Sequence, residues 1–427
     1  MSRVLLIVVT VILCVVLGGL VYFAMKPVPI QSEKVSIGKS LELVKTYPEN
    51  SSGLKKDYFT GKLYKAGKIN VVVMEGTYKE MGKQYGALLK DELNANYNGM
   101  IEGLKNIKSF TVESFQDFGN MIYDSYPEKY QQIVNGLAES SGLGTEKAKF
   151  LLGQESYVYA ALLELAKGEN ISGSAHCSGL ATWGDYTGGG PLVFGRNYDL
   201  GPVNHENAML AIYNPIDGSI PSSSFTFAGA IYTTTGMNRD GLFLELNNGS
   251  ASDNADYTGI RTWTPLTVFS FLEQSKNLNQ VDVAFNSTLP DLSYIINAAD
   301  PKYAYSFEWS TNGVKKKEPD KAGLMAATNL FFDPAWGPQS YDFSKDPDAV
   351  VIRRDNLLKL AEANKGNINV SKMMEIISTP LKDGGSFRDP NLTSYEIVAV
   401  PETLKMWLRI PEYQDWVEVN LAEYFNK

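Results

Sequence analysis

The spacing of apolar residues changes character near residue 170. Upstream, apolar residues recur three and four positions apart, as on one face of a helix. Downstream, short runs rich in β-branched and aromatic residues are separated by clusters of Gly, Asn and Asp, which is typical of strands joined by turns. Many strands with a few helices between them, without regular βαβ alternation, predict an α+β sandwich.

A β-branched run, Ile69–Gly76, introduces the helical part. Thr77 and Glu80 then have the spacing of a capping box, which starts a helix. The predicted helices span 77–97, 115–137, 146–165, 265–274, 350–364 and 371–377. The predicted strands span 179–183, 191–199, 208–213, 224–236, 241–248, 302–310, 323–332, 394–401 and 404–411.

The N-terminus has a different pattern from the rest of the chain. Val4–Met25 is 22 apolar or small residues without a charge, long enough for a helix to cross a hydrocarbon core of roughly 30 Å. A signal peptide normally has a shorter apolar core and a small-x-small cleavage site. We therefore predict an uncleaved transmembrane anchor over 1–26, with a cleaved signal segment as the alternative. The polar residues 27–60 are predicted to form a tether.

Charge and cysteine content restrict the class of protein. Because Arg3 precedes the apolar run, the bulk of the chain is expected outside the cytoplasm, membrane-anchored or secreted. Without residues 1–26, 37 Lys and Arg face 48 Asp and Glu, a formal charge of −11, so we expect no nucleic-acid partner. Cys177 is the only cysteine besides Cys14, which lies in the apolar run. It is either a small buried residue or a nucleophile.

A nucleophilic thiol needs a base or a cation nearby, because little of a free thiol is ionised at pH 7. The chain has two histidines, His176 next to the cysteine and His205 in a loop-like stretch. A Cys177–His205 dyad is one alternative. So few Cys and His residues cannot assemble a zinc ligand set, and the acidic residues lack the spacing of a calcium loop. We expect no metal and no organic cofactor.

Another base would arise if the peptide bond between His176 and Cys177 were cut. The freed α-amino group, with an ordinary pKa of about 7.7–8.0, could take the proton from the cysteine's own side chain. Such a group needs a carboxylate or amide to orient it, a cation to favour the thiolate, and donors for an oxyanion. Arg196 and Asp199 follow a glycine-rich turn at 188–190, from which a hairpin could bring them beside Cys177.

Four motifs, taken in order, resemble a known family. They are Cys177 at the start of a strand, G-R-N-Y-D at 195–199, G-M-N-R-D-G-L at 236–242 leading into LELNNG, and A-T-N at 327–329. The set is similar to the N-terminal-nucleophile (Ntn) amidases of the choloylglycine hydrolase superfamily. That superfamily includes bile-salt hydrolases, penicillin V acylases, acid ceramidase-like amidases and the penicillin acyltransferase branch. The long upstream part, with its EMGKQYG helix, resembles the prosegment of the acyltransferase and ceramidase-like branch.

The resemblance implies a fold, a processing step and a set of roles. It implies a four-layer αββα sandwich over 177–427, preceded by a mainly helical prosegment over 61–176. That prosegment would stay associated as an α chain after cleavage between His176 and Cys177. The implied roles are the following: Cys177 is the nucleophile and its freed amine the base, Asp199 holds the amine, Arg196 stabilises the thiolate, Asn248 (or Asn247) donates to the oxyanion, Asn329 is a second active-site asparagine, and Arg353 (or Arg354) opens the following helix.

Each of these residues also has a simpler interpretation. Arg196 and Asp199 could form a surface ion pair. Asn248 could be a turn residue, Asn329 could end a strand, and Arg353 could be a solvated helix residue.

The predicted function is an autoproteolytically activated cysteine amidase or acyltransferase acting on linear amides. The expected partner is a small N-acyl amine, N-acyl amino acid or penicillin-like substrate with an apolar acyl group. Candidates to line its pocket, although such residues more often only pack, are Trp183, Tyr186, Tyr198, Tyr232 and Trp263. A non-catalytic extracytoplasmic binding protein with the same fold is the alternative from another class.

Overall fold

The computed structural model describes residues 41–48, 59–107, 111–156, 176–201, 205–249, 261–336 and 349–426. The predicted anchor, Val4–Met25, lies outside these residues. Within the described ranges, no helix combines the length and the apolar composition needed to span a bilayer. Residues Ile37–Lys427 form one compact unit, and the elements below belong to it.

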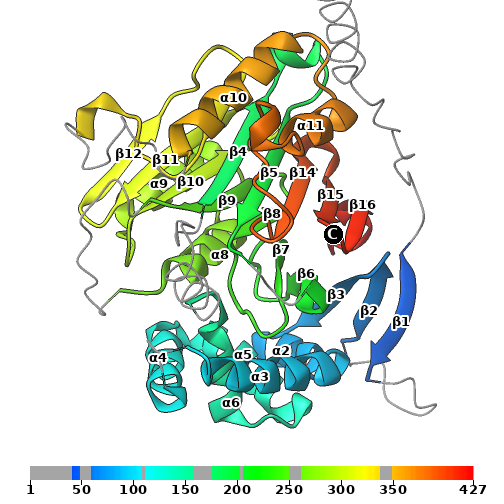
Figure 1. The fold of residues 1–427 in the computed structure, drawn as a ribbon. Helices are drawn as coiled ribbons and strands as arrows, with labels where there is room; N and C mark the ends of the chain where they lie inside the picture. Colours follow the sequence, from blue (N-terminus) through cyan, green and yellow to red (C-terminus); the bar gives the residue numbers. More distant parts are fainter. Residues whose placement is uncertain are drawn as a thin grey trace, which may run out of the picture. The chain divides into compact units, whose positions relative to one another are not determined.

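Two sheets form the centre of this unit (Figure 1). The larger sheet consists of β1 (Glu42–Tyr47), β2 (Gly61–Ala66), β3 (Ile69–Gly76), β6 (Ala208–Pro215), β7 (Ser222–Phe227), β8 (Thr235–Asn238), β9 (Phe243–Asn248), β10 (Tyr294–Ala299), β11 (Ala304–Ser310) and β12 (Gly313–Lys317), in that spatial order. The smaller sheet has the order β13 (Leu324–Ala327), β4 (His176–Thr182), β5 (Val193–Asp199), β14 (Tyr395–Val400), β15 (Lys405–Ile410) and β16 (Gln414–Asn420). The described strand pairs are antiparallel except β3 with β6, which are parallel.

Helices cover the outer face of each sheet. Those described are α2 (Tyr78–Leu88), α3 (Lys90–Leu104), α4 (Val112–Ser125), α5 (Glu128–Ser141), α6 (Thr145–Leu152), α8 (Thr264–Gln274), α9 (Leu278–Ser287), α10 (Val350–Ala363) and α11 (Val370–Ile377). α10 and α11 pack on the smaller sheet, and the others lie on the side of the larger sheet. The layers therefore follow the order αββα, as expected.

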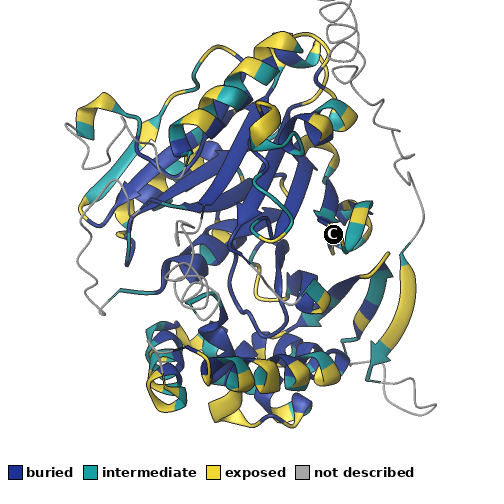
Figure 2. Cartoon of the chain, viewed as in Figure 1, coloured by how far each residue is buried: buried dark blue, intermediate teal, exposed yellow. Residues whose placement is uncertain are grey.

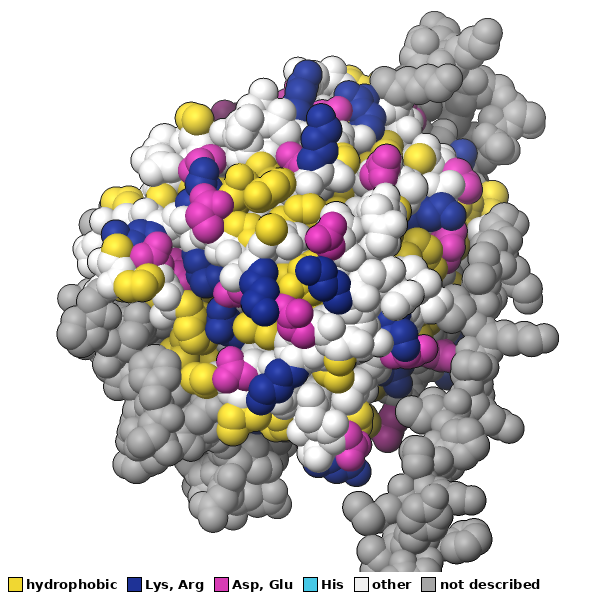
Figure 3. All heavy atoms as spheres, turned by 90° about the horizontal axis from the view of Figure 1, so that it is seen from above, with side chains coloured by type: hydrophobic (Ala, Val, Ile, Leu, Met, Phe, Trp, Pro, Cys, Tyr) yellow, Lys and Arg dark blue, Asp and Glu magenta, His cyan; other side chains and the backbone are white. Residues whose placement is uncertain are grey.

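The inner faces of the two sheets meet in an apolar core. Phe194 of the smaller sheet packs on Phe243 of the larger one with ring centroids 4.9 Å apart, and Tyr395 packs on Phe225 at 4.7 Å. Figure 2 shows both sheets as mostly buried, whereas the helices expose their outer faces. On the face seen in Figure 3, basic and acidic side chains are interspersed with apolar ones.

The helices before Cys177 are fixed by a cap and by close packing. Thr77 and Glu80 form the predicted capping box, with the Thr77 N–H donating to Glu80 Oε2 at 2.8 Å and the Glu80 N–H donating to Thr77 Oγ1 at 3.3 Å. A side chain at Gly82 of α2 would place its Cβ 2.1 Å from the carbonyl oxygen of Ile133 of α5. The glycine of the EMGKQYG motif therefore allows close contact between the two helices.

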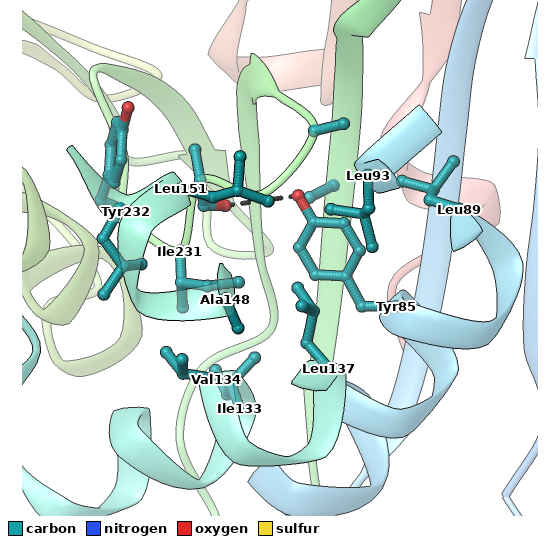
Figure 4. Close-up of a cluster of buried hydrophobic side chains, with 14 of the residues drawn as sticks. Tyr85, Leu89, Leu93, Ile133, Val134, Leu137, Ala148, Leu151, Ile231 and Tyr232 are labelled. Atoms are coloured by element: carbon teal, nitrogen blue, oxygen red, sulfur yellow. Dashed lines mark hydrogen bonds between the residues drawn. The ribbon is translucent and has the colours of Figure 1, made fainter. Parts of the chain in front are cut away.

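These helices bury an apolar cluster against the segment that follows β7 (Figure 4). Tyr85 reaches across this contact, where its hydroxyl accepts the N–H of Gly229 at 2.9 Å. The labelled members of the cluster are Tyr85, Leu89, Leu93, Ile133, Val134, Leu137, Ala148, Leu151, Ile231 and Tyr232. The helical part is therefore packed on the strand-rich part.

The structure corrects several sequence predictions. β1 lies inside the predicted tether, and β2 and β3 of the mainly helical prosegment belong to the larger sheet. β1 exposes most of its residues (Figure 2), so its sequence has no apolar pattern from which a strand could be predicted. The predicted strand 224–236 is two strands, β7 and β8. α9, β10, β12 and β16 were not predicted from the sequence.

Candidate active site

A hairpin brings Cys177 beside the G-R-N-Y-D motif. β4 and β5 pair with Cys177 opposite Tyr198 and Gly179 opposite Arg196. Opposed residues of an antiparallel pair point to the same face, and alternate residues share that face. The side chains of Cys177 and Arg196 therefore both point toward the larger sheet. The hairpin inferred from the glycine-rich turn is confirmed.

Arg196 directs its charge at the cysteine sulfur from a fully buried position. Its guanidinium donates to the carbonyl oxygens of Thr234 and Leu246 at 2.7 Å each. It also lies 3.2 Å from the carboxylate of Glu245. Nη2 lies 3.7 Å from Cys177 Sγ. The simpler interpretation of Arg196 as a surface residue is therefore wrong.

The main chain of Cys177 is held by Asn329 and Arg353. The Cys177 N–H donates to Asn329 Oδ1 at 2.8 Å. Arg353 donates through Nη1 to the Cys177 carbonyl oxygen at 3.1 Å and through Nη2 to Asn329 Oδ1 at 3.2 Å. Both side chains are buried. Arg353 is thus not a solvated helix residue, and Asn329 reaches the nitrogen that cleavage would free.

Asp199 lies at the end of β5, opposite His176 in the hairpin. Thr393 Oγ1 donates to Asp199 Oδ1 at 2.7 Å, and Arg353 Nη1 lies 3.6 Å from Oδ2. Oδ2 is buried and accepts no hydrogen bond from the described residues. Burial raises the pKa of Asp199 to about 6, while Arg353 is the main group that opposes the shift. Asp199 therefore retains an oxygen able to accept a further donor.

The neighbours named as alternatives point elsewhere. Asn247 is fully buried and donates to the Thr328 carbonyl oxygen at 3.3 Å, whereas Asn248 lines the cavity beside the cysteine. Arg354 forms an ion pair with Asp320. The position of Asn248 in the cavity wall and of Arg353 at Cys177 favours these two residues over their neighbours.

The Cys177 thiol is protonated at neutral pH in the uncut chain. Burial raises its pKa to about 11, and the charges of Asp199 and Glu245 act in the same direction. Arg196 and a hydrogen bond from the Asp199 backbone oppose the shift. Ionisation of the sulfur therefore needs a proton acceptor close by.

A cavity of about 390 Å³ opens beside Cys177. This size is within the range of small-molecule sites. Its wall is mainly apolar, with polar groups close to the sulfur. The described lining residues are Phe118, Glu155, Ser156, Cys177, Tyr198, Asp199, Leu200, Leu246, Asn248, Trp263, Pro265, Asp291, Leu292 and Tyr294. Residues from both sides of the predicted cleavage point therefore build one cavity.

The aromatic candidates divide into two groups. Tyr198 and Trp263 line the cavity, and Tyr232 lies behind them with its ring 4.6 Å from that of Trp263. Trp183 and Tyr186 are absent from the described lining and make packing contacts elsewhere. Two of the five predicted lining residues are therefore found in the wall.

None of the described contacts joins His205 to Cys177. It lies in a short 3₁₀ helix, His205–Asn207, with its ring 5.7 Å from that of Tyr413. Burial lowers its pKa, and Glu412 opposes the shift. Across the described ranges, no cluster of three or more His, Cys, Asp or Glu is arranged to hold a metal ion.

Sequence reasoning missed three residues near the site. Glu245 pairs with Arg196, Thr393 donates to Asp199, and Glu155 lines the cavity. Glu245 had a local signal, because its motif LELNNG was already singled out. Glu155 and Thr393 had none, since they reach the site only through long-range folding.

Comparisons with known proteins find relatives at the level of structure. No family model matches the chain, and no curated protein does. A Caenorhabditis elegans ortholog of N-acylethanolamine-hydrolyzing acid amidase matches at 20% identity and a TM-score of 0.42, over 58% of this chain and 97% of its own.

A variant of the conjugated bile acid hydrolase from Clostridium perfringens matches at 13% identity and a TM-score of 0.42, over 58% of this chain and 93% of its own. The penicillin V acylase from Agrobacterium tumefaciens matches at 12% identity and a TM-score of 0.42, over 58% and 87%.

Proposed function

We propose that this chain is an autoproteolytically activated cysteine amidase or acyltransferase of the Ntn type. One observation carries the proposal: the nitrogen and the sulfur of Cys177 each have buried polar partners beside one cavity. Asn329 accepts the N–H at 2.8 Å, and Arg196 lies 3.7 Å from the sulfur. The freed amine would supply a base on the same residue as the sulfur.

Activation would begin with attack of Cys177 Sγ on the carbonyl carbon of His176. The C–N bond to Cys177 then breaks, the Cys177 nitrogen takes a proton, and a thioester links His176 to the sulfur. Water hydrolyses this thioester, which leaves a carboxylate on His176 and restores the thiol. The products are an α chain ending at His176 and a β chain beginning at Cys177.

Turnover would use the same groups on an external amide. The α-amine accepts the thiol proton, and the thiolate attacks the substrate carbonyl. Asn248 donates to the developing oxyanion, and the leaving amine takes the proton held by the α-ammonium group. Water or an acceptor amine then cleaves the acyl thioester. Asp199 Oδ2 and Asn329 Oδ1 would hold the ammonium group.

The geometry favours this function over the two alternatives. A binding protein gives no reason for a guanidinium 3.7 Å from the sulfur of a cysteine that lines a cavity and whose N–H is held by Asn329. A Cys177–His205 dyad needs hydrogen-bonding distance, whereas His205 packs on Tyr413. We also propose an extracytoplasmic location with Val4–Met25 as the anchor, because this segment is long and apolar enough to span a bilayer as a helix.

Acyl transfer to Cys177 can be measured directly. The cleaved protein is mixed with N-acyl amino acids, N-acylethanolamines, conjugated bile acids and penicillin V, quenched in acid, and analysed by mass spectrometry. We expect the β chain to gain the mass of one acyl group with at least one of these amides. Cys177→Ala, tested as the full chain, should gain none. A cleaved protein that forms no acyl adduct and releases no amine would contradict the proposal.

A further inference from the structure

Glu155 contributes an acidic side chain to the cavity from the part of the chain that precedes Cys177. Its neighbour Gln154 is buried and fixes the segment: Gln154 Oε1 accepts from Asn96 Nδ2 at 3.1 Å, and Gln154 Nε2 donates to the Ala228 carbonyl oxygen at 3.5 Å. The position of Glu155 is therefore set by contacts to both the helices and the sheet.

Tyr198 is the hydrogen-bond partner of Glu155 within the described part of the chain. Its hydroxyl donates to Glu155 Oε1 at 2.7 Å. Tyr198 lies opposite Cys177 in the hairpin, so this bond connects the Glu155 carboxylate to the hairpin that carries Cys177. Burial raises the pKa of Glu155 to about 7, while the Tyr198 hydrogen bond and the charge of Arg196 oppose the shift. No described Lys or Arg forms an ion pair with Glu155.

The charges that face the cavity are acidic. Glu155, Asp199 and Asp291 line it, and none of the described lining residues is Lys, Arg or His. Arg353 lies close enough to balance Asp199, and Thr264 donates to Asp291 through its hydroxyl and its N–H.

Arg196 is the nearest cation to Glu155, but it is already paired. It lies behind the ring of Tyr198, 4.9 Å from the centroid, and its charge is balanced by Glu245. Glu155 is therefore a carboxylate of the wall with one described hydrogen-bond donor, Tyr198, and no described ion pair.

The remaining wall is apolar, with Phe118, Leu246, Trp263, Leu292 and Tyr294 among its residues. A hydrocarbon acyl chain can be buried there. A carboxylate on the substrate would lie among acidic groups without a basic partner, which costs free energy in a buried site. An ammonium group would instead donate a charge-assisted hydrogen bond to Glu155.

We propose that Glu155 selects the amine half of the substrate, and that this half carries a second, protonated amino group. The substrate class is then the N-acylated diamine, with its acyl chain on the apolar wall and its free ammonium group on Glu155. This inference rests on the proposed function, since Cys177 must first attack the amide.

Three amides with one acyl group test the inference. They are the N-octanoyl amides of 1,4-diaminobutane, 4-aminobutan-1-ol and 4-aminobutanoate, which end in an ammonium, a hydroxyl and a carboxylate group. With the cleaved protein at pH 8, where Glu155 is mainly ionised, we expect kcat/KM to fall in that order. The ammonium amide should exceed the carboxylate amide by about tenfold or more.

Substitutions at position 155 assign the preference. Glu155→Gln keeps an acceptor for Tyr198 and should lower the ratio of kcat/KM for the ammonium amide to that for the hydroxyl amide by about tenfold. Glu155→Arg should shift the ranking toward the carboxylate amide. Glu146→Gln, a change at an exposed carboxylate on α6, should keep the parent ranking.

Two results would overturn the inference. One is a wild-type preference for the hydroxyl or carboxylate amide, and the other is an ammonium preference that Glu155→Gln leaves intact. p-Nitrophenyl octanoate separates this failure from failure of the proposed function. If the ester acylates Cys177 but the ammonium amide is not preferred, only the substrate assignment fails. If neither the ester nor any amide acylates Cys177, the proposed function fails with it.

Discussion

At the scale of single residues, the site combines two opposite demands on Cys177. Burial keeps the thiol protonated, with a pKa of about 11, while Arg196 stabilises the thiolate from 3.7 Å away. A new ammonium group next to the sulfur would add a second cation. Cleavage would therefore change the sulfur from a buried thiol into a more readily ionised one.

Arg353 and Arg354 offer a matched test of the site. Arg353→Ala removes the donors to the Cys177 carbonyl oxygen and to Asn329, so we expect cleavage at 176–177 to slow by at least about a hundredfold. Arg354→Ala breaks a pair with Asp320 one residue away and should cleave at nearly the parent rate. The fraction cleaved against time on a denaturing gel measures both. Equal rates in the two variants would remove Arg353 from the site.

The ionisation of Asp199 predicts the acid side of the activity profile. Its pKa is raised to about 6 in the uncut chain, and the α-ammonium group of the cut chain would lower it. Below that pKa the carboxyl is protonated and no longer holds the ammonium group. We therefore expect kcat/KM for a neutral amide to fall as the pH drops through 6 or a lower value. A profile that is flat from pH 8 to pH 4 would contradict this role.

Residues on the Cys177 hairpin could be placed from the sequence itself, whereas Asn329 and Arg353, 152 and 176 residues away, could be assigned only through the family resemblance. Arg196 and Asp199 lie on the strand that pairs with Cys177, so a short turn was enough to place them. Glu155 lies 43 residues before Tyr198 in the sequence and reaches the cavity through the packing of the preceding helices on the rest of the unit. No local pattern distinguishes it from a surface glutamate.

At the scale of elements, the apolar pattern predicted the positions of the buried strands. β5, β6 and β14 are buried along most of their length and were placed close to their true bounds. β12, Gly-Val-Lys-Lys-Lys, is an edge strand with three charged residues, and β1 is exposed. Edge strands are held by backbone pairing on one side, which leaves little trace in the sequence.

A buried carboxylate joins the helices before Cys177 to α8. Glu273 of α8 accepts from Tyr130 at 2.7 Å and Tyr78 at 3.0 Å, and pairs with Lys129 at 2.9 Å. Glu273→Ala leaves these three donors without their acceptor, and we expect it to lower the free energy of unfolding by about 3–5 kcal/mol. Urea titration followed by fluorescence measures the change.

Glu139 is the control for that experiment. It also pairs with lysines, Lys79 and Lys83, but on the exposed surface of α5. Glu139→Ala should have little effect on the urea midpoint, because exposed ion pairs contribute little. A Glu273→Ala midpoint equal to that of Glu139→Ala would show that the buried network does not hold the two parts together.

At the scale of the whole molecule, the part before Cys177 is built into the sandwich. β3 lies between β2 and β6, so a strand from before the cleavage point pairs with one from after it. After cleavage we therefore expect both chains to elute together from a size-exclusion column in native buffer and to separate only in denaturant. Elution of the β chain alone in native buffer would contradict this.

The central claim is that Cys177 becomes an N-terminal nucleophile, and intact-mass spectrometry under denaturing conditions tests it most directly. For the purified parent protein we predict two chains, the second with the mass of Cys177–Lys427 and cysteine as its first residue. The Cys177→Ala protein should remain a single uncut chain. A parent protein that stays intact over days, or that is cut at a different bond, would contradict the claim.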